Sequence, residues 1–188
     1  MKAILRVAAF VLAGLGVHCV KGTTDLSLPM PPANLERGIS LYREGRLEDA
    51  AKVLKQAASD NPREELAFTY LGLALLRDGK VELALAPIEK ALRIDPGQVE
   101  ALFALGLYHR LAGNPVEAIR ELERAVALNP THAEAHRELG LSCLELDRLD
   151  CAREQLARFL ELEPRAPEEM RELLEQLLEL APLKGSPH

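Results

Sequence analysis

The 188-residue sequence has no tryptophan, 4% aromatic residues, and no cluster of lysines and arginines. Binding to nucleic acid needs positive surface charge and stacking aromatic rings, so this composition and the net charge of −6 argue against it. The sequence also lacks a glycine-rich phosphate loop, a nucleophile motif and a cysteine cluster. We therefore predict neither an enzyme nor a cofactor-binding protein.

Two histidines four positions apart, His132 and His136, are the best candidates for a chemical site. Such a pair can share one face of a helix and bind zinc. However, His132 precedes its expected helix, and His136 stands at a packing position. The sequence therefore favours ordinary packing for both, and we predict no metal site.

What the sequence does contain is a regular period. Prolines, glycines and alanines recur at one constant step: Pro62, Pro96, Pro130 and Pro164; Gly38, Gly72, Gly106 and Gly140; Ala50, Ala84, Ala118 and Ala152. This 34-residue period indicates one supersecondary unit stacked on copies of itself. The four units are residues 31–64, 65–98, 99–132 and 133–166, called units 1 to 4 below.

Each unit reads as two helices joined by a turn, because two apolar stripes at helical spacing flank a turn residue. We expect positive φ at these turn residues, which are Gly45, Gly79, Gly113 and Asp147. Each proline of the period disfavours helix in the residue before it, so the second helices should stop at Asn61, Asp95, Asn129 and Glu163. Pro87 lies inside a predicted helix and should kink it. Gly72 should face Ala84 and let the two helices approach closely.

These residues resemble the tetratricopeptide repeat family. The resemblance covers residues 31–166 and rests on an apolar residue, Leu-Gly, two alanines and a proline at fixed offsets, although the family's tryptophan is missing. It implies an all-α, right-handed solenoid of four helix-turn-helix repeats over residues 33–166. The apolar face of residues 167–181 predicts a C-terminal helix that caps unit 4, followed by a disordered tail at 182–188.

The N-terminus has the pattern of a secretory signal peptide over residues 1–18. Lys2 and Arg6 precede the apolar run from Val7 to Val17. This run is shorter than the about 20 residues that span a bilayer. We expect export to the periplasm or cell envelope, with residues 19–32 as a linker; an uncleaved anchor and a cytoplasmic start are the alternatives.

Cys19 is a candidate lipidation site, because it follows the apolar run as the modified cysteine does in bacterial lipoproteins. His18 departs from the small residue usual before that cysteine, so cleavage nearby without lipidation is the other possibility. The remaining cysteines, Cys143 and Cys151, lie on the two helices of unit 4. An exported protein can bridge such a pair. Because Cys143 should be buried and Cys151 exposed, two free thiols are the expected state.

The family resemblance also implies where a partner binds. First helices line the concave side of such an array, and the corresponding positions form an apolar floor with an arginine from each unit. Such a groove suits a protein or peptide segment with apolar and acidic side chains. The family's clamp for a chaperone carboxylate is not expected, since leucine or isoleucine replaces its asparagines. The predicted groove residues are Ile39, Tyr42, Arg43, Thr69, Leu73, Leu76, Arg77, Phe103, Leu107, Arg110, Arg137, Leu141 and Leu144. For Leu73 and Leu107 taken individually, a contact between neighbouring units is the favoured alternative.

These patterns together predict a non-catalytic protein-interaction scaffold of the cell envelope. The alternative is a small lipoprotein resembling the pilotins, repeat proteins that escort a secretin to the outer membrane. Cys19 and the overall layout are the features that favour this alternative.

Overall fold

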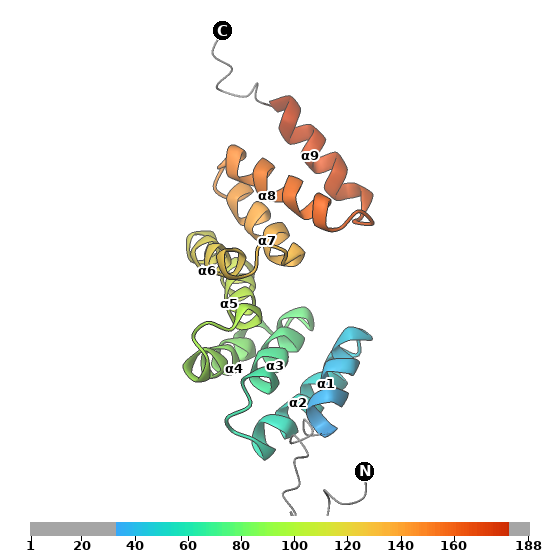
Figure 1. Cartoon of the computed structure of the whole chain (residues 1–188), viewed down its shortest axis with the longest axis vertical. Coiled ribbons are helices and arrows are strands. Elements are labelled where there is room, and N and C mark those ends of the chain that lie inside the picture. The colour runs from blue at the N-terminus through green and yellow to red at the C-terminus, as the bar shows by residue number, and fades with distance from the viewer. Residues whose placement is uncertain (1–32, 181–188) are drawn as a thin grey trace, which may run out of the picture. The chain divides into compact units, whose positions relative to one another are not determined.

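The computed structural model describes residues 33–180, and within this range the chain forms α-helices and no strand (Figure 1). The predicted signal peptide, linker, Cys19 and C-terminal tail lie outside the described residues. The helices are α1 (Ala33–Arg43), α2 (Leu47–Asp60), α3 (Glu65–Arg77), α4 (Val81–Ile94), α5 (Val99–Leu111), α6 (Pro115–Leu128), α7 (Ala133–Leu144), α8 (Leu149–Leu162) and α9 (Glu168–Leu180).

The helices form pairs, and each pair corresponds to one unit of the period. Every helix contacts the next one along the chain. The first helices of neighbouring units also contact one another, through α1–α3, α3–α5 and α5–α7, whereas over residues 33–180 the second helices of neighbouring units share no such contact. The first helices therefore lie side by side, as in an α-solenoid. This confirms the predicted all-α repeat fold.

Turn and helix-end residues behave as the period predicts. Gly45, Gly79 and Gly113 have φ of 77°, 77° and 76°, and Asp147 has φ of 56°. The residue before each repeated proline, such as Asn61 before Pro62, follows directly after the last residue of its helix. Helix α4 continues through Pro87 without a break.

Close packing inside each pair depends on the repeated glycine. A Cβ atom built on Gly72 would lie 2.4 Å from Cγ1 of Ile88, and one on Gly106 would lie 2.5 Å from Cγ of Leu122. Both distances are too short for two carbon atoms. The backbone oxygen of Ala84 lies 3.5 Å from the Cβ built on Gly72, so Gly72 faces Ala84 as predicted, and the Ile88 side chain lies closer still.

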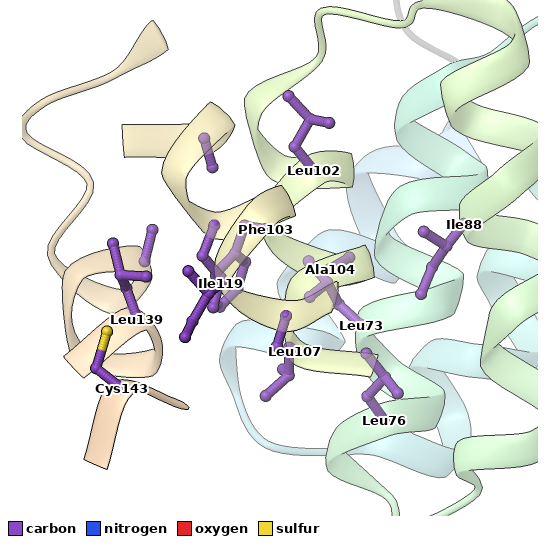
Figure 2. Close-up of a cluster of buried hydrophobic side chains, with 14 of the residues drawn as sticks. Leu73, Leu76, Ile88, Leu102, Phe103, Ala104, Leu107, Ile119, Leu139 and Cys143 are labelled. Carbon is purple, nitrogen blue, oxygen red and sulfur yellow. The ribbon is translucent and has the colours of Figure 1, made fainter. Parts of the chain in front are cut away.

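The core consists of two clusters of buried side chains. One cluster of buried side chains extends from α3 to α9 (Figure 2), and a second one joins α1, α2 and α3. Leu102, Leu122 and Leu156 are fully buried. No described helix has the length and apolar character that crossing a membrane requires.

Helix α9 continues the register of the repeats without completing a fifth unit. Leu177 stands one full period after Cys143, and both side chains are buried. The buried guanidinium of Arg153 on α8 donates a hydrogen bond from Nε to the carbonyl oxygen of Leu177 at 2.8 Å. That oxygen belongs to the last turn of α9, where carbonyls have no partner within the helix. Arg153 therefore attaches α9 to α8; whether α9 keeps the end of the array soluble stays a prediction.

Candidate protein-binding groove

A hollow of about 530 Å³ opens on the side of the first helices. All four units contribute to it, because its lining comes from α1, α3, α5 and α7. We call it the first-helix groove; it is lined by Tyr42, Leu76, Arg77, Phe103, Leu107, Arg110, Leu111, Glu134, Arg137 and Glu138.

The structure brings seven of the thirteen predicted groove residues into this lining and leaves the other six outside it. The seven are Tyr42, Leu76, Arg77, Phe103, Leu107, Arg110 and Arg137. The six are Ile39, Arg43, Thr69, Leu73, Leu141 and Leu144.

Two of the six residues are buried in the core. The Thr69 side chain is fully buried: its hydroxyl lies 2.9 Å from the carbonyl oxygen of Glu65 and contacts Oε1 of Gln98. Leu73 is 3% exposed and belongs to the core cluster shown in Figure 2. Neither side chain is available to a partner, because the contact between α3 and α5 covers this face of α3.

Apolar side chains form the floor of the groove. Phe103 and Leu107 are 8% and 9% exposed, whereas Leu111 at the end of α5 is 43% exposed. The Phe103 ring also packs on the imidazole of His132, with ring centroids 4.9 Å apart. Burial lowers the pKa of His132 below its ordinary value, so this packing favours the neutral imidazole.

Arg77 is the accessible cation of the groove. Its guanidinium carbon lies 5.1 Å from the centre of the Tyr42 ring, which is the geometry of a cation–π contact. No carboxylate within residues 33–180 forms an ion pair with it. The charge of Arg77 is therefore available to a ligand.

Arg110 and Arg137 are held by carboxylates of the groove itself. Glu138, whose side chain is 3% exposed, accepts hydrogen bonds from Nε of Arg110 at 2.6 Å and from Nη2 of Arg137 at 2.8 Å. Arg110 also lies 3.4 Å from Glu145, and Arg137 lies 2.7 Å from Glu134. Carboxylates thus neutralise the groove at α5 and α7.

The predicted arginine from each unit is therefore only partly right. One period onward from Arg77 stands Leu111, and one period back from Arg110 stands Leu76. Arg43 and Arg77 are one period apart, but Arg43 lies outside the lining. The three arginines that line the groove, Arg77, Arg110 and Arg137, occupy three different positions of the period.

Sequence reasoning missed Leu111, Glu134 and Glu138. A step of one period from Arg77 would have found Leu111. Glu134 stands three positions before Arg137, which is a helical spacing that signals an ion pair on α7, whereas Glu138 directly follows Arg137 and has no such signal. The hydrogen bond that Arg110 donates to Glu138 joins two different units, so it follows from the packing of α5 against α7.

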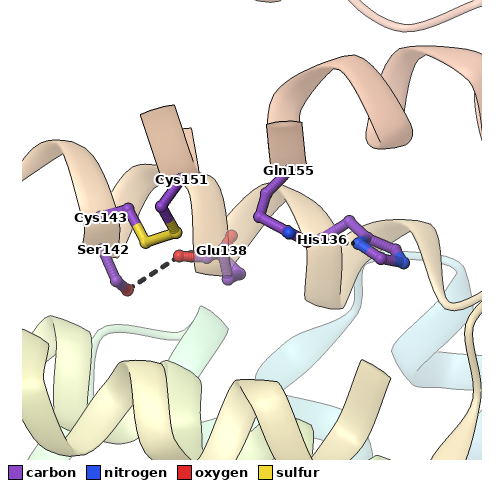
Figure 3. The surroundings of a disulfide bond; sticks show 6 residues. All are labelled: His136, Glu138, Ser142, Cys143, Cys151 and Gln155. Atoms are coloured by element: carbon purple, nitrogen blue, oxygen red, sulfur yellow. Dashed lines mark hydrogen bonds between the residues drawn. A yellow bond between two sulfur atoms is a disulfide. The ribbon is translucent and has the colours of Figure 1, made fainter. Parts of the chain in front are cut away.

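The two histidines considered for metal binding take part in ordinary contacts. Nδ1 of His132 accepts a hydrogen bond from the backbone N–H of Ala135 at 3.2 Å. The ring nitrogens of His136 lie 2.8 Å from Oε1 of Gln155 and 3.1 Å from the carbonyl oxygen of Pro130 (Figure 3). Over residues 33–180 no group of three or more metal-ligating side chains comes together.

The expectation of two free thiols in unit 4 is wrong. Cys143 on α7 and Cys151 on α8 form a disulfide with an S–S distance of 2.03 Å and a Cα–Cα distance of 5.9 Å (Figure 3). The Cα distance lies in the range usual for such a bridge. Cys151 is only half-buried, but the first turn of α8 packs over α7 and brings the two sulfur atoms together. The exposure of each cysteine therefore does not decide whether the two form a disulfide.

Comparison with known proteins identifies the family. Two family models described as tetratricopeptide repeat match residues 35–99 and 109–182. A search of curated protein sequences finds no match.

Solved structures of repeat proteins resemble this fold. A tetratricopeptide repeat protein of Thermus thermophilus is 26% identical, covering 78% of this chain and 80% of its own, with a TM-score of 0.66. Pseudomonas aeruginosa pilF is 23% identical, covering 79% and 67%, with a TM-score of 0.68. The first repeat domain of Spaghetti (RPAP3), bound to the HSP90 peptide SRMEEVD, is 23% identical, covering 62% and 92%, with a TM-score of 0.57. The chain therefore belongs to the tetratricopeptide repeat family.

Proposed function

We propose that this protein is a non-catalytic scaffold that binds a segment of a partner protein in the first-helix groove. Tetratricopeptide repeats are generally interaction modules and not enzymes. The observation that carries the proposal is the groove lining, in which side chains from all four units surround one hollow and together give it an apolar and a charged part. A continuous groove of this kind suits an extended or helical segment.

The groove favours a ligand with an apolar side chain beside an acidic one. Phe103, Leu107 and Leu111 offer the apolar surface, and Arg77 offers the unpaired positive charge. Arg110 and Arg137 are already neutralised, so the acidic group should lie toward α1 and α3. The peptide bound to the RPAP3 domain also combines an apolar residue, methionine, with acidic residues.

Capture from cell extract followed by variant binding tests this proposal. Arg77→Glu should keep the fold, because the side chain is exposed and both residues suit a helix. We expect the captured partner to bind this variant at least about tenfold more weakly, which corresponds to about 1.4 kcal/mol. Binding to wild type should weaken at high salt as well.

The control is Arg93→Glu, an equal change of charge at an exposed position outside the groove lining. It should leave the affinity unchanged. If Arg77→Glu binds as tightly as wild type, or if both variants lose affinity equally, the binding surface is not the first-helix groove.

We propose the cell envelope as the place of action, on the basis of the signal-peptide pattern in residues 1–18. Cell fractionation and the mass of the mature N-terminus test this. An intact Met1 in a cytoplasmic fraction would contradict it.

The position of Cys19 after the apolar run favours a second candidate, the pilotin-like lipoprotein that assists assembly of an outer-membrane secretion or pilus complex. A diacylglyceryl group on Cys19 would support this candidate. An unmodified N-terminus beyond Cys19 would leave the soluble scaffold.

A further inference from the structure

A second hollow, of about 380 Å³, lies between α2, α3 and α4. We call it the α2–α4 hollow. Its apolar lining includes Leu71, Leu75, Leu83 and Pro87, and it shares no residue with the first-helix groove. It is therefore a separate surface of units 1 and 2.

Leu83 makes this surface unusual. Its side chain is 61% exposed, more than any other large apolar side chain of residues 33–179. Pro87, four positions later, has no N–H, so the Leu83 carbonyl oxygen lacks its usual helical hydrogen bond. An exposed apolar side chain and a proline thus lie together in the lining of the hollow.

Lysines surround this apolar surface. Over residues 33–180 there are four lysines, and three of them, Lys52, Lys55 and Lys80, border the hollow. Lys52 lies 3.4 Å from Glu48, and Lys80 lies 2.7 Å from Asp78. Pairs with an exposed lysine contribute little to stability, so a ligand carboxylate can take the place of Glu48 or Asp78.

The equivalent position is closed in unit 4. Two periods onward from Leu75 and Leu83 stand Cys143 and Cys151, which form the disulfide. In unit 3, one period onward, the equivalent residues are His109 and Glu117, a polar pair. Unit 2 alone among these three presents two leucines there.

We propose that the α2–α4 hollow binds an acidic, amphipathic helix of a second partner protein. One bulky apolar side chain of that helix would pack against Leu75, Leu83 and Pro87, and carboxylates on its flanks would pair with the lysines. A projecting side chain can enter this recess, whereas a flat membrane surface cannot. An anionic membrane would also repel residues 99–180, which carry seventeen acidic residues against nine arginines.

The test uses the full chain and a fluorescein-labelled helical peptide with leucine on one face and glutamate on the other. Leu83→Ser and the double variant Lys52→Glu/Lys55→Glu should each weaken binding roughly tenfold or more, because they remove the apolar contact or reverse the charge. A peptide with lysine in place of every glutamate should bind wild type at least roughly tenfold more weakly.

Matched controls separate this surface from the first-helix groove. Leu128→Ser changes a leucine that is 57% exposed outside the hollow, and Arg93→Glu reverses an exposed charge on α4. Both should bind the peptide as wild type does. A loss of affinity confined to Arg77→Glu would place the peptide in the first-helix groove and overturn the proposal.

Other outcomes would overturn it as well. These are the absence of peptide binding to wild type, unchanged binding by Leu83→Ser, and Leu83-dependent binding to phosphatidylglycerol vesicles or to a second copy in place of the peptide. Sedimentation with vesicles and analytical ultracentrifugation of the protein alone measure the last two.

Discussion

Units 1 and 2 have the same helix-turn-helix architecture as units 3 and 4, but the two halves differ in the number and the pairing of their charged side chains. Residues 33–98 carry eleven acidic and ten basic side chains, including all the lysines of the described range, whereas residues 99–180 carry seventeen and nine. Turns have positive φ in both halves, and the glycine contacts are alike. The halves therefore differ in side chains and not in architecture.

The acidic half satisfies many of its charges internally. Glu138 binds two arginines, and the buried Glu121 accepts hydrogen bonds from Arg120 and Arg124. The first half leaves Arg77 and Lys55 without an ion pair in the described range, and it leaves Leu83 exposed. The comparison teaches that the repeated residues build the array, while the unrepeated ones decide which surfaces are open to partners.

The largest expected effect on stability tests the close helix packing at the repeated glycine, which both halves have in common. Gly72→Leu and Gly106→Leu force a side chain against Ile88 and Leu122, and each should lower the free energy of unfolding by about 3 kcal/mol or more. Urea denaturation measures this. Gly97→Leu is the control, because only one side-chain atom lies near the added carbon, at 3.5 Å. Unequal losses at positions 72 and 106 would show that the halves do not share one packing.

Removing one charged side chain should lower the stability more in units 3 and 4 than in units 1 and 2. Glu138→Ala leaves two arginines without their buried partner and should cost about 2–3 kcal/mol of stability, less than a fully buried pair because both arginines are partly exposed. Arg77→Ala should cost less than about 1 kcal/mol, since it loses an exposed cation–π contact. Equal costs in thermal melting would contradict the distinction between satisfied and available charges.

The disulfide sharpens the comparison at equivalent positions of units 2 and 4. The bridge closes a short loop between Cys143 and Cys151, and loop-closure entropy predicts a loss of about 2.5 kcal/mol when it is reduced. Differential scanning calorimetry with and without reductant measures this. The melting temperature of the double variant Cys143→Ala/Cys151→Ala should not change with reductant. If reductant leaves the melting temperature of wild type unchanged as well, the disulfide is refuted.

The smallest effect concerns His132, where unit 4 packs on Phe103 of unit 3. Burial lowers the pKa of His132 in the folded state. At a pH between the folded and the unfolded pKa, the unfolded chain therefore binds more protons than the folded one. This contribution to stability is present above pH 6.5, and it is lost as the pH falls toward the lower folded pKa. His132→Asn keeps a helix-capping residue and should make urea stability between about pH 7.5 and 5.5 less dependent on pH. An unchanged dependence would contradict this assignment.

Prediction from sequence succeeded where a physical cause acts within one unit. The glycines at turns, the prolines after helices and the apolar stripes act locally, so the helix positions followed from them. It failed for Thr69, which a neighbouring first helix covers, and for the disulfide, whose two cysteines meet only when α8 packs on α7. Glu138 was missed for the same reason, because its partner Arg110 lies in the preceding unit.

The sequence by itself determined the fold of this protein, because a strict period leaves each unit one way to bury its apolar stripe, against the next copy. The expectation of a groove on the side of the first helices came from the family resemblance. Only the tertiary structure decided which charges of that groove are available. Arg110 and Arg137 meet Glu138 across the contact between α5 and α7, whereas Arg77 meets a tyrosine ring. Charge pairing depends on short distances between units, and a period along the chain carries no such distances.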